Sequence, residues 1–187
     1  METKIPSVIF RRPENIRPYL KELRVKHFEV SKSRKIYVCD YSMPSLEDVK
    51  MLVGNIKPDV LMIDYLQRCY PPKSDSRRLE ISKLVFGFKT IAREDKIPVI
   101  LAAQLNRDSE KRGRPQLGDL MESGAIEAES DVVVLLSEEM PKDGKIDFNN
   151  RRISAYTAKN RHGQARVFTL LLNRATTNIT EVQNGEI

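Results

Sequence analysis

In the segment Asp59-Val-Leu-Met-Ile-Asp64, an apolar run leads directly to a carboxylate, and this pattern is the main indication of the fold class. An apolar run without polar alternation is typical of a strand that is covered on both faces, as in a parallel sheet. Two further runs of this kind follow at residues 98–103 and 131–137. We therefore expect a core of buried strands, with Asp64 at the carboxyl end of the first.

Helical patterns alternate with these strands. Apolar residues recur at helical spacing behind Ser45, a good N-cap, and this helix should end near residues 54–58. A clear apolar stripe predicts a second helix over residues 77–94. The alternation of strand and helix predicts an α/β fold with a largely parallel sheet.

The two ends of the chain have other patterns. Residues 14–29 predict a helix interrupted at Pro18, and residues 35–39 predict a short strand. Towards the C-terminus, a turn-rich stretch between two apolar segments predicts a β-hairpin. The predicted C-terminal strands are residues 153–159, 165–172 and 179–182. We expect one domain, with an N-terminal extension (1–34), an α/β core (35–140) and a hairpin region (150–183).

Composition and charge narrow the class of protein. A chain of 187 residues with 40% hydrophobic residues has room for one compact domain with a core. Its net charge of +6 favours a polyanionic partner, although a solvated lysine-rich surface explains the charge equally well. No apolar run approaches the roughly 20 residues of a membrane helix, so we expect no membrane partner. Two cysteines make neither a metal cluster nor a disulfide framework, which favours a reducing, cytoplasmic compartment.

Four polar motifs follow one another along the chain. They are Asp64-Tyr-Leu-Gln67, Gln104-Leu-Asn-Arg107, Glu122-Ser-Gly-Ala-Ile-Glu-Ala-Glu-Ser-Asp131 and Lys159-Asn-Arg161-His-Gly163. In this order they resemble the C-terminal motor domain of DnaB-type replicative DNA helicases, which has a RecA-like P-loop ATPase fold. The resemblance covers residues 36–182. It is the series of four motifs, and no single one, that is specific.

The resemblance implies roles for two residues at strand ends. Asp64 matches the Walker B aspartate, which holds Mg²⁺, usually through water, beside the phosphates of ATP. Taken alone, an acid that ends a strand is more often a turn former or cap. Gln104 matches a glutamine that senses the terminal phosphate, a task that suits an amide because it donates and accepts hydrogen bonds. The alternative for Gln104 is a surface polar residue that closes a strand.

The predicted hairpin carries two cations. Lys159 and Arg161 match a basic pair that reaches across a subunit boundary to the neighbour's nucleotide as an arginine finger. Alternate residues on a strand share a face, so both cations can reach one phosphate. A guanidinium there stabilises charge on the transferred phosphoryl group. The alternative is an exposed hairpin with solvated charges.

Loop residues are the candidates for contact with single-stranded DNA. Residues 119–124 resemble a loop that contacts DNA phosphates, although Met121 stands where the family typically has arginine. The backbone N–H of Gly124 can still approach a phosphate closely, whereas we expect Glu122 to cap a helix. Cations of the neighbouring loops are expected to bind the DNA backbone without reading sequence, with solvated loops as the alternative. These cations are Lys73, Arg77, Arg78, Arg107, Lys111, Arg112 and Arg114.

The phosphate cradle G-x-x-x-x-G-K-[S/T] does not occur in these 187 residues. Gly113 and Gly118 have the right separation, but Asp119 stands where lysine is required. In the family the cradle strand lies between the strands at 98–103 and 132–136, so its loss would uncover apolar surface. We therefore expect a fragment or a naturally truncated product that does not hydrolyse ATP alone. We also expect an aberrant sheet or self-association to fill the gap.

The expected function is part of the ATP-dependent motor of a DnaB-type helicase that translocates on single-stranded DNA. The resemblance implies ATP and Mg²⁺ in the intact parent, a homo-oligomer that is a hexamer in the family, and a primase or helicase loader as partner. One alternative is an ATPase-dead module that docks on a helicase ring or on DNA and regulates it. Another is a recombinase- or KaiC-like relative, which the first and last of the four motifs disfavour. DNA upstream of the Met1 codon would separate the first two possibilities.

Overall fold

A computed structural model describes residues 8–9, 25–31, 34–40, 43–106, 114–120, 124–139, 147 and 149–182. The chain divides into two compact units, Met1–Pro44 and Ser45–Ile187. The first unit includes the strand Arg34–Cys39, which pairs with the strand that precedes it.

The first unit contains a small antiparallel sheet. Strands β1 (Val8–Ile9), β2 (Val25–Ser31) and β3 (Arg34–Cys39) follow one another in that order. The strand predicted at residues 35–39 is thereby confirmed. The helix predicted up to residue 29 is wrong over residues 25–29, which pair with β3. This segment is rich in β-branched and aromatic residues, and pairing with β3 overrides its helical spacing.

The second unit contains both predicted helices. Helix α1 (Leu46–Ile56) begins with a capping box, in which the Ser45 hydroxyl accepts from the Asp48 N–H while the Asp48 carboxylate accepts from the Ser45 N–H. Helix α2 (Arg77–Glu94) begins after Ser76, whose hydroxyl accepts from a backbone N–H of the first turn. Local capping therefore explains why both helices start where the sequence predicts.

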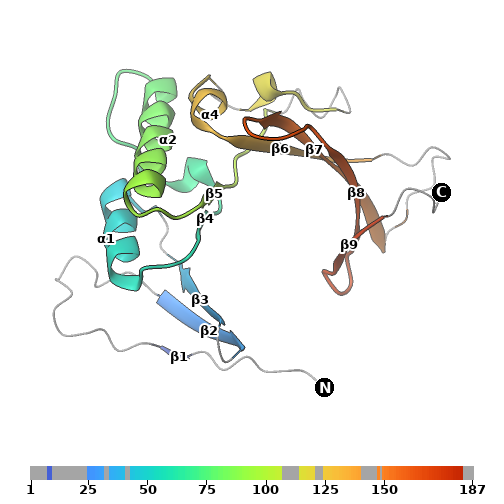
Figure 1. The fold of residues 1–187 in the computed structure, drawn as a ribbon, viewed down its shortest axis with the longest axis horizontal. Coiled ribbons are helices and arrows are strands. Elements are labelled where there is room, and N and C mark those ends of the chain that lie inside the picture. Colours follow the sequence, from blue (N-terminus) through green and yellow to red (C-terminus); the bar gives the residue numbers. More distant parts are fainter. Residues whose placement is uncertain are drawn as a thin grey trace. The chain divides into compact units, whose positions relative to one another are not determined.

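Two sheets follow from the strands of this unit (Figure 1). Strands β4 (Leu61–Ile63) and β5 (Val99–Leu101) are parallel. A second sheet is antiparallel, in the order β6 (Val132–Glu138), β7 (Asn150–Asn160), β8 (Val167–Asn173) and β9 (Ile179–Glu181). The α/β class and the C-terminal hairpin are confirmed. Among the described residues, however, parallel pairing is confined to β4 and β5, and β6 pairs with β7 instead.

The core of the second unit lies between the helices and one face of these strands. Its fully buried side chains are centred on α2, where Ile81, Leu84 and Phe88 are almost inaccessible. The inward residues of β6 and a short helix, α4 (Gly124–Glu129), pack against the same cluster. Two single-turn 3-10 helices, η2 (Leu66–Arg68) and η3 (Leu117–Asp119), complete the described elements.

The opposite face of the strands is exposed, which corrects the expectation that they are covered on both faces. Met62 is 70% exposed, Ile100 51% and Val134 51%. On β6, exposed and buried residues alternate. The apolar residues therefore lie on both faces of the strand, and only one face packs against the core. No helix in the described part of the chain is long and apolar enough to cross a membrane.

Candidate functional site

Asp64 and Gln104 lie past the ends of two paired strands. The parallel pairing of β4 and β5 continues beyond both strands, because the Ala102 N–H donates to the Ile63 carbonyl at 2.9 Å and the Leu66 N–H donates to the Ala102 carbonyl at 2.8 Å. Asp64 therefore stands beside the start of the segment that leads to Gln104, and both residues are exposed. The fold brings these two predicted residues to the same edge of the sheet.

Gln67 connects the two strand ends. Its Oε1 accepts a hydrogen bond from the Gln104 N–H at 3.3 Å, and its Nε2 is buried without a partner among the described residues. Gln67 belongs to the sequence motif that begins at Asp64, but the sequence pattern alone indicates no role for it. The contact could not be predicted, because 37 residues separate the two glutamines.

Lys159 and Arg161 converge on the end of α4. Lys159 Nζ donates to the carbonyl oxygens of Glu127 and Ala128, and Arg161 Nη2 donates to the same Ala128 oxygen. The predicted proximity of the two cations is therefore present. Both contacts are made within one chain, and the Arg161 side chain remains 44% exposed.

Asp131 joins this cluster, although the sequence pattern alone does not indicate it. Its carboxylate lies 3.4 Å from Arg161 Nη1 and 2.6 Å from Lys89 Nζ on α2, and its carbonyl accepts from the Arg161 N–H at 2.9 Å. The hydrogen bond from Lys89 is the main cause that lowers the pKa of Asp131 below 3.8, and the charge of Arg161 adds to it. Asp131 is therefore the anion that holds two cations from different elements.

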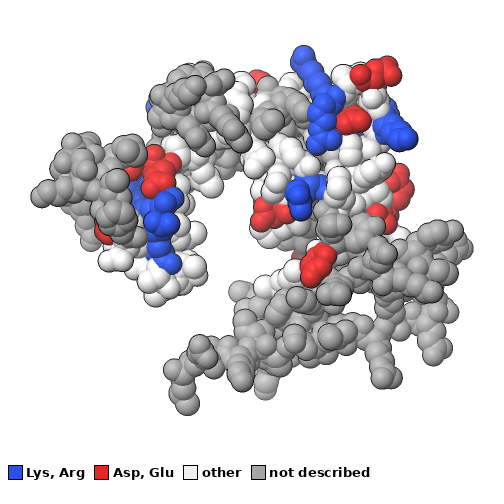
Figure 2. All heavy atoms as spheres, turned by 180° about the vertical axis from the view of Figure 1, so that it is seen from behind, with Lys and Arg blue, Asp and Glu red and all other residues white. Residues whose placement is uncertain are grey.

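The candidate DNA-binding cations are spread over several contacts. Arg77 Nη1 lies 3.3 Å from a Glu80 carboxylate oxygen, and Lys73 is exposed in the loop before α2. Gly124 lies beside Arg78, since a Cβ at Gly124 would stand 3.0 Å from Arg78 Nη2. On the face drawn in Figure 2, basic and acidic side chains are interspersed and form no continuous basic surface among the residues that the structure describes.

Several candidates lie outside the described residues. These are Arg107, Lys111 and Arg112 of the predicted DNA loop, together with Met121 and Glu122. Their predicted roles stay predictions.

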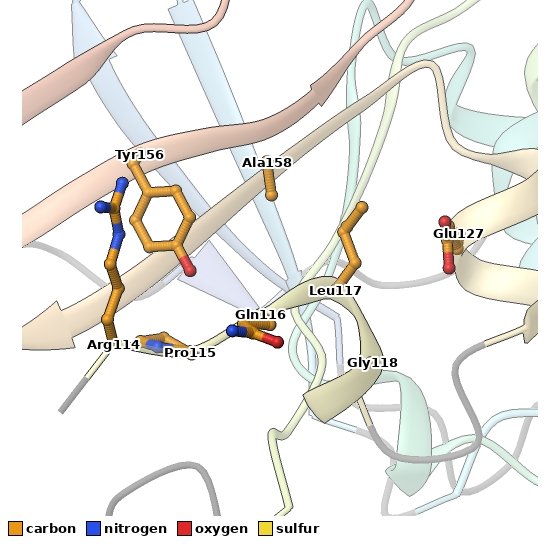
Figure 3. A pocket seen from close by; sticks show the side chains of 8 residues that line it. All are labelled: Arg114, Pro115, Gln116, Leu117, Gly118, Glu127, Tyr156 and Ala158. Atoms are coloured by element: carbon orange, nitrogen blue, oxygen red, sulfur yellow. The ribbon is translucent and has the colours of Figure 1, made fainter. Parts of the chain in front are cut away.

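Arg114 lies at a cavity that the sequence did not predict (Figure 3). The cavity has a volume of about 610 Å³ and is lined by Arg114, Pro115, Gln116, Leu117, Gly118, Glu127, Tyr156 and Ala158. The Arg114 guanidinium lies over the Tyr156 ring, 4.7 Å from its centre, in a cation–π contact. Burial raises the pKa of Tyr156. This predicted DNA-binding cation is thus held against an aromatic ring of β7.

The donor set at Asp64 fits a magnesium ion that keeps its water. Within the described ranges, no group of three or more His, Cys, Asp or Glu side chains is placed to hold a metal. Mg²⁺ in nucleotide sites is typically bound by one or two carboxylates, substrate phosphates and several waters. The exposed Asp64 carboxylate at the sheet edge can therefore serve as the protein ligand of such an ion.

Comparisons with known proteins agree with the order of motifs. The family described as "DnaB-like helicase C terminal domain" matches residues 2–181. The Replicative DNA helicase DnaB of Mycoplasma pneumoniae is 33% identical over 155 residues, which are 74% of this chain and 32% of that protein. A probable plasmid replicative DNA helicase of Chlamydia psittaci is 34% identical, over 80% of this chain and 34% of that protein.

Solved structures show the same fold. A DnaB-like replicative helicase, described with its interactions with primase, superposes with a TM-score of 0.69 at 30% identity, covering 77% of this chain and 36% of that one. A second solved structure, of an ATPase domain, also gives a TM-score of 0.69 at 30% identity, over 77% of this chain and 54% of that domain. The chain spans about a third of the length of the two curated relatives. With the motifs, the fold and the sequence match in agreement, this chain belongs to the family of DnaB-like helicase C-terminal domains.

Proposed function

We propose that the chain is part of the ATP-dependent motor of a replicative DNA helicase that moves along single-stranded DNA. Family membership supports the general function. The observation that carries the proposal is the position of Asp64 and Gln104 at one edge of the β4–β5 pair, joined through Gln67. The carboxyl edge of parallel strands is where α/β proteins place their ligand sites.

Each candidate residue has a task in this proposal. Asp64 holds Mg²⁺ through water, and the bound ion neutralises charge on the phosphates. Gln104 donates its amide to the terminal phosphate and accepts from a loop, while Gln67 fixes the backbone from which Gln104 projects. Lys159 and Arg161 reach the nucleotide of a neighbouring copy, where they stabilise the transferred charge.

A nucleotide site of this fold also needs a phosphate cradle, G-x-x-x-x-G-K-[S/T], and this motif does not occur in the 187 residues. The proposed assembly is a homo-oligomer in the cytoplasm, with a primase or a helicase loader as a further partner. One solved relative is described by its interactions with primase, which supports that choice.

The test is whether the chain completes a neighbour's site. A DnaB-family helicase is prepared with its own basic pair neutralised, and ATP turnover is measured after the chain is added. We expect the wild-type chain to raise the ATP turnover of the helicase whose basic pair is neutralised. The K159Q/R161Q variant should leave that turnover unchanged. The R166Q variant, which removes an exposed arginine before β8, should act as the wild type. Equal rescue by the wild type and the double variant would refute the proposal, as would ATP hydrolysis by the chain alone.

A regulatory module is the second candidate. The exposed apolar face of β4, β5 and β6 favours it, because such a face suits a chain that docks on another protein. In the same mixture, a regulatory module would lower the turnover of an intact helicase without rescuing the crippled one.

A further inference from the structure

The cavity beside β7 contains a buried polar group without a partner. Tyr156 is only 9% exposed, and its hydroxyl makes no hydrogen bond to any residue that the structure describes. Burying a hydroxyl without a partner costs free energy, so such groups are rare in folded proteins. In Figure 3 the hydroxyl points from β7 towards the segment that carries Gln116. An unpaired hydroxyl at the inner end of a cavity indicates a ligand that pairs with it.

A cation lies beside this hydroxyl. The Arg114 guanidinium stands 4.7 Å from the centre of the Tyr156 ring. A cation–π contact uses none of the N–H donors of a guanidinium. Burial raises the pKa of Tyr156, against the opposing charge of Arg114, so at neutral pH the hydroxyl keeps its proton and can donate as well. Neighbouring donors of this kind, one of them charged, suit an anionic oxygen.

The cavity is too large for a bare ion. Its volume is about 610 Å³, which is within the range of sites that hold small organic ligands. Pro115, Leu117 and Ala158 give part of its lining an apolar character, and Gln116 adds an amide. An apolar wall suits the flat face of a nucleobase better than it suits a sugar, and an amide can pair with the edge of a base. The ligand that fits is an anionic group joined to a ring system of nucleobase size.

The charges of the lining favour a single phosphate. Glu127 also lines the cavity, and Figure 3 shows it well away from Arg114 and Tyr156. The lining therefore combines one cation with one carboxylate, so a chain of phosphates would extend from the cation towards like charge. A monophosphate held at Arg114 avoids this repulsion.

We propose that this cavity binds a nucleoside monophosphate, either free or as one unit of a single strand. The phosphate accepts hydrogen bonds from the Arg114 guanidinium and the Tyr156 hydroxyl, and the base lies against the apolar lining. Neither Asp64 nor Gln104 lines the cavity, so this site is separate from the sheet edge. It does not depend on the proposed function; only its occupation by a DNA strand rests on that function.

An NMR titration of the 187-residue chain with thymidine monophosphate tests the site. The signals followed are the Tyr156 ring and the backbone amides of residues 116–118. We expect both sets to shift along one binding curve. Thymidine, which lacks the phosphate, should leave them unchanged at the same concentrations. Absent response to the monophosphate, or an equal response to thymidine, would overturn the proposal.

Two variants identify the hydrogen-bond donors. Y156F removes the hydroxyl and keeps the ring, so it should bind thymidine monophosphate about fivefold more weakly. R114Q removes the charged donor and should weaken binding further, about tenfold. Y37F on β3 and R93Q near the end of α2 are the matched controls, and both should bind as the wild type does. Wild-type affinity in Y156F would refute the assignment.

The stability of Y156F gives a second readout, which a purely structural tyrosine would move in the opposite direction. Removing an unpaired buried hydroxyl should leave the free energy of unfolding in urea unchanged or higher when no ligand is present. Weaker binding in a variant that is at least as stable as the wild type supports the site. A less stable Y156F would show that the hydroxyl has a partner within the chain, and the argument for a ligand would fail.

Two further ligands identify the source and the charge of the nucleotide. Oligothymidine that shifts the same signals in the wild type, and not in Y156F, identifies one unit of a single strand, whereas a response to the monophosphate alone identifies a free nucleotide. Thymidine triphosphate should bind more weakly than the monophosphate, and about threefold more tightly to E127Q than to the wild type. Preference of the wild type for the triphosphate contradicts the assignment of a single phosphate. Absent rescue of ATP turnover together with an intact effect of Y156F would remove only the proposed function.

Discussion

At the scale of single residues, Asp131 shows how one carboxylate connects elements that are far apart in the sequence. It follows α4, it precedes β6, and its charge binds a lysine of α2 and the arginine past β7. The Asp131 side chain is half exposed, so its ion pairs contribute little to stability. They do fix the positions of the Lys89 and Arg161 side chains.

The lowered pKa of Asp131 gives a pH prediction. A group whose pKa is lower in the folded state stabilises the fold above its unfolded pKa, and this contribution is lost as the pH falls through the folded pKa. We expect the wild type to be more stable than D131N at pH 7, by less than about 1 kcal/mol for a pair this exposed. The difference should disappear as the pH falls below the ordinary value of 3.8. Urea denaturation followed by circular dichroism at several pH values measures it.

The control for this prediction is E138Q. Glu138 is the last residue of β6, the strand that Asp131 precedes. Its carboxylate lies 2.9 Å from the Arg151 guanidinium, and the exposure of this ion pair is similar. It holds one cation where Asp131 holds two, so its loss should matter less. A D131N variant that is as stable as the wild type at pH 7 would show that the carboxylate does not hold the cluster.

The sequence predicted some site residues and not others for a physical reason. Asp64 and Gln104 follow apolar strands, and the carboxyl ends of parallel strands share an edge, so their proximity could be inferred from order alone. Lys89 lies in α2 and Asp131 lies between α4 and β6, 42 residues further along the chain. Their contact depends on how α2 packs beside α4, which no local pattern encodes.

At the scale of elements, local signals predicted the helices and long-range pairing decided the strands. The bounds of α2 follow from its N-cap and apolar stripe, which are properties of neighbouring residues. Strand β6 pairs with β7 over seven residues, and this long-range pairing determines its place in the sheet. An apolar run predicts a strand but not its partner. The sequence therefore predicts a parallel partner for β6, whereas its described partner is antiparallel.

The glycines of helices α1 and α2 give a stability prediction. Gly54 lies in α1, and a Cβ added there would meet no described atom within 4 Å, so G54A should raise the free energy of unfolding by up to about 1 kcal/mol through helix propensity. At Gly87 in α2, an added Cβ would stand 2.4 Å from a methyl carbon of Leu46. Leu46 would have to move, so G87A should gain less than G54A or lose stability.

Urea denaturation of the two variants beside the wild type measures this difference. Because both substitutions replace a helical glycine with alanine, G54A is the matched control for G87A. A G87A variant that gains as much as G54A would show that α1 and α2 do not approach closely at Leu46.

At the scale of the whole molecule, basic and acidic side chains are interspersed on the face drawn in Figure 2. The candidate DNA contacts are cations of loops and of the first turn of α2. Since a backbone-only interaction releases counterions, its affinity should depend strongly on salt and little on sequence.

We expect weak binding of the chain to oligothymidine that falls steeply with salt, with a slope of about −0.7 in log K against log salt for each phosphate contacted. R78Q should weaken binding several-fold, because Arg78 lies beside the loop glycine Gly124. R93Q, at the other end of α2, is the matched control and should bind as the wild type does. Fluorescence anisotropy at several salt concentrations measures both, and affinity that ignores salt would contradict the interaction.

The uncovered apolar face leads to a prediction about association. Exposed apolar side chains alternate along β6, where they are Val132, Val134 and Leu136, and Met62 of β4 and Ile100 of β5 are exposed as well. Exposed apolar surface favours contact with another chain. We expect sedimentation velocity to show association that grows with concentration. V134K should reduce it, because a charge in the middle of this face must be desolvated when two faces meet.

A matched control, F86K, distinguishes association through the strands from non-specific hydrophobic association. Phe86 is 63% exposed on α2, whose neighbouring residues Val85 and Phe88 are buried in the core, so Phe86 lies on the far side of the helix from the strands. F86K introduces the same charge at a similarly exposed apolar position. Association that is lost in V134K and retained in F86K places the contact on the strands. Equal loss in both variants, or a wild-type chain that stays monomeric at every concentration, would mean that the exposed strand face does not drive assembly.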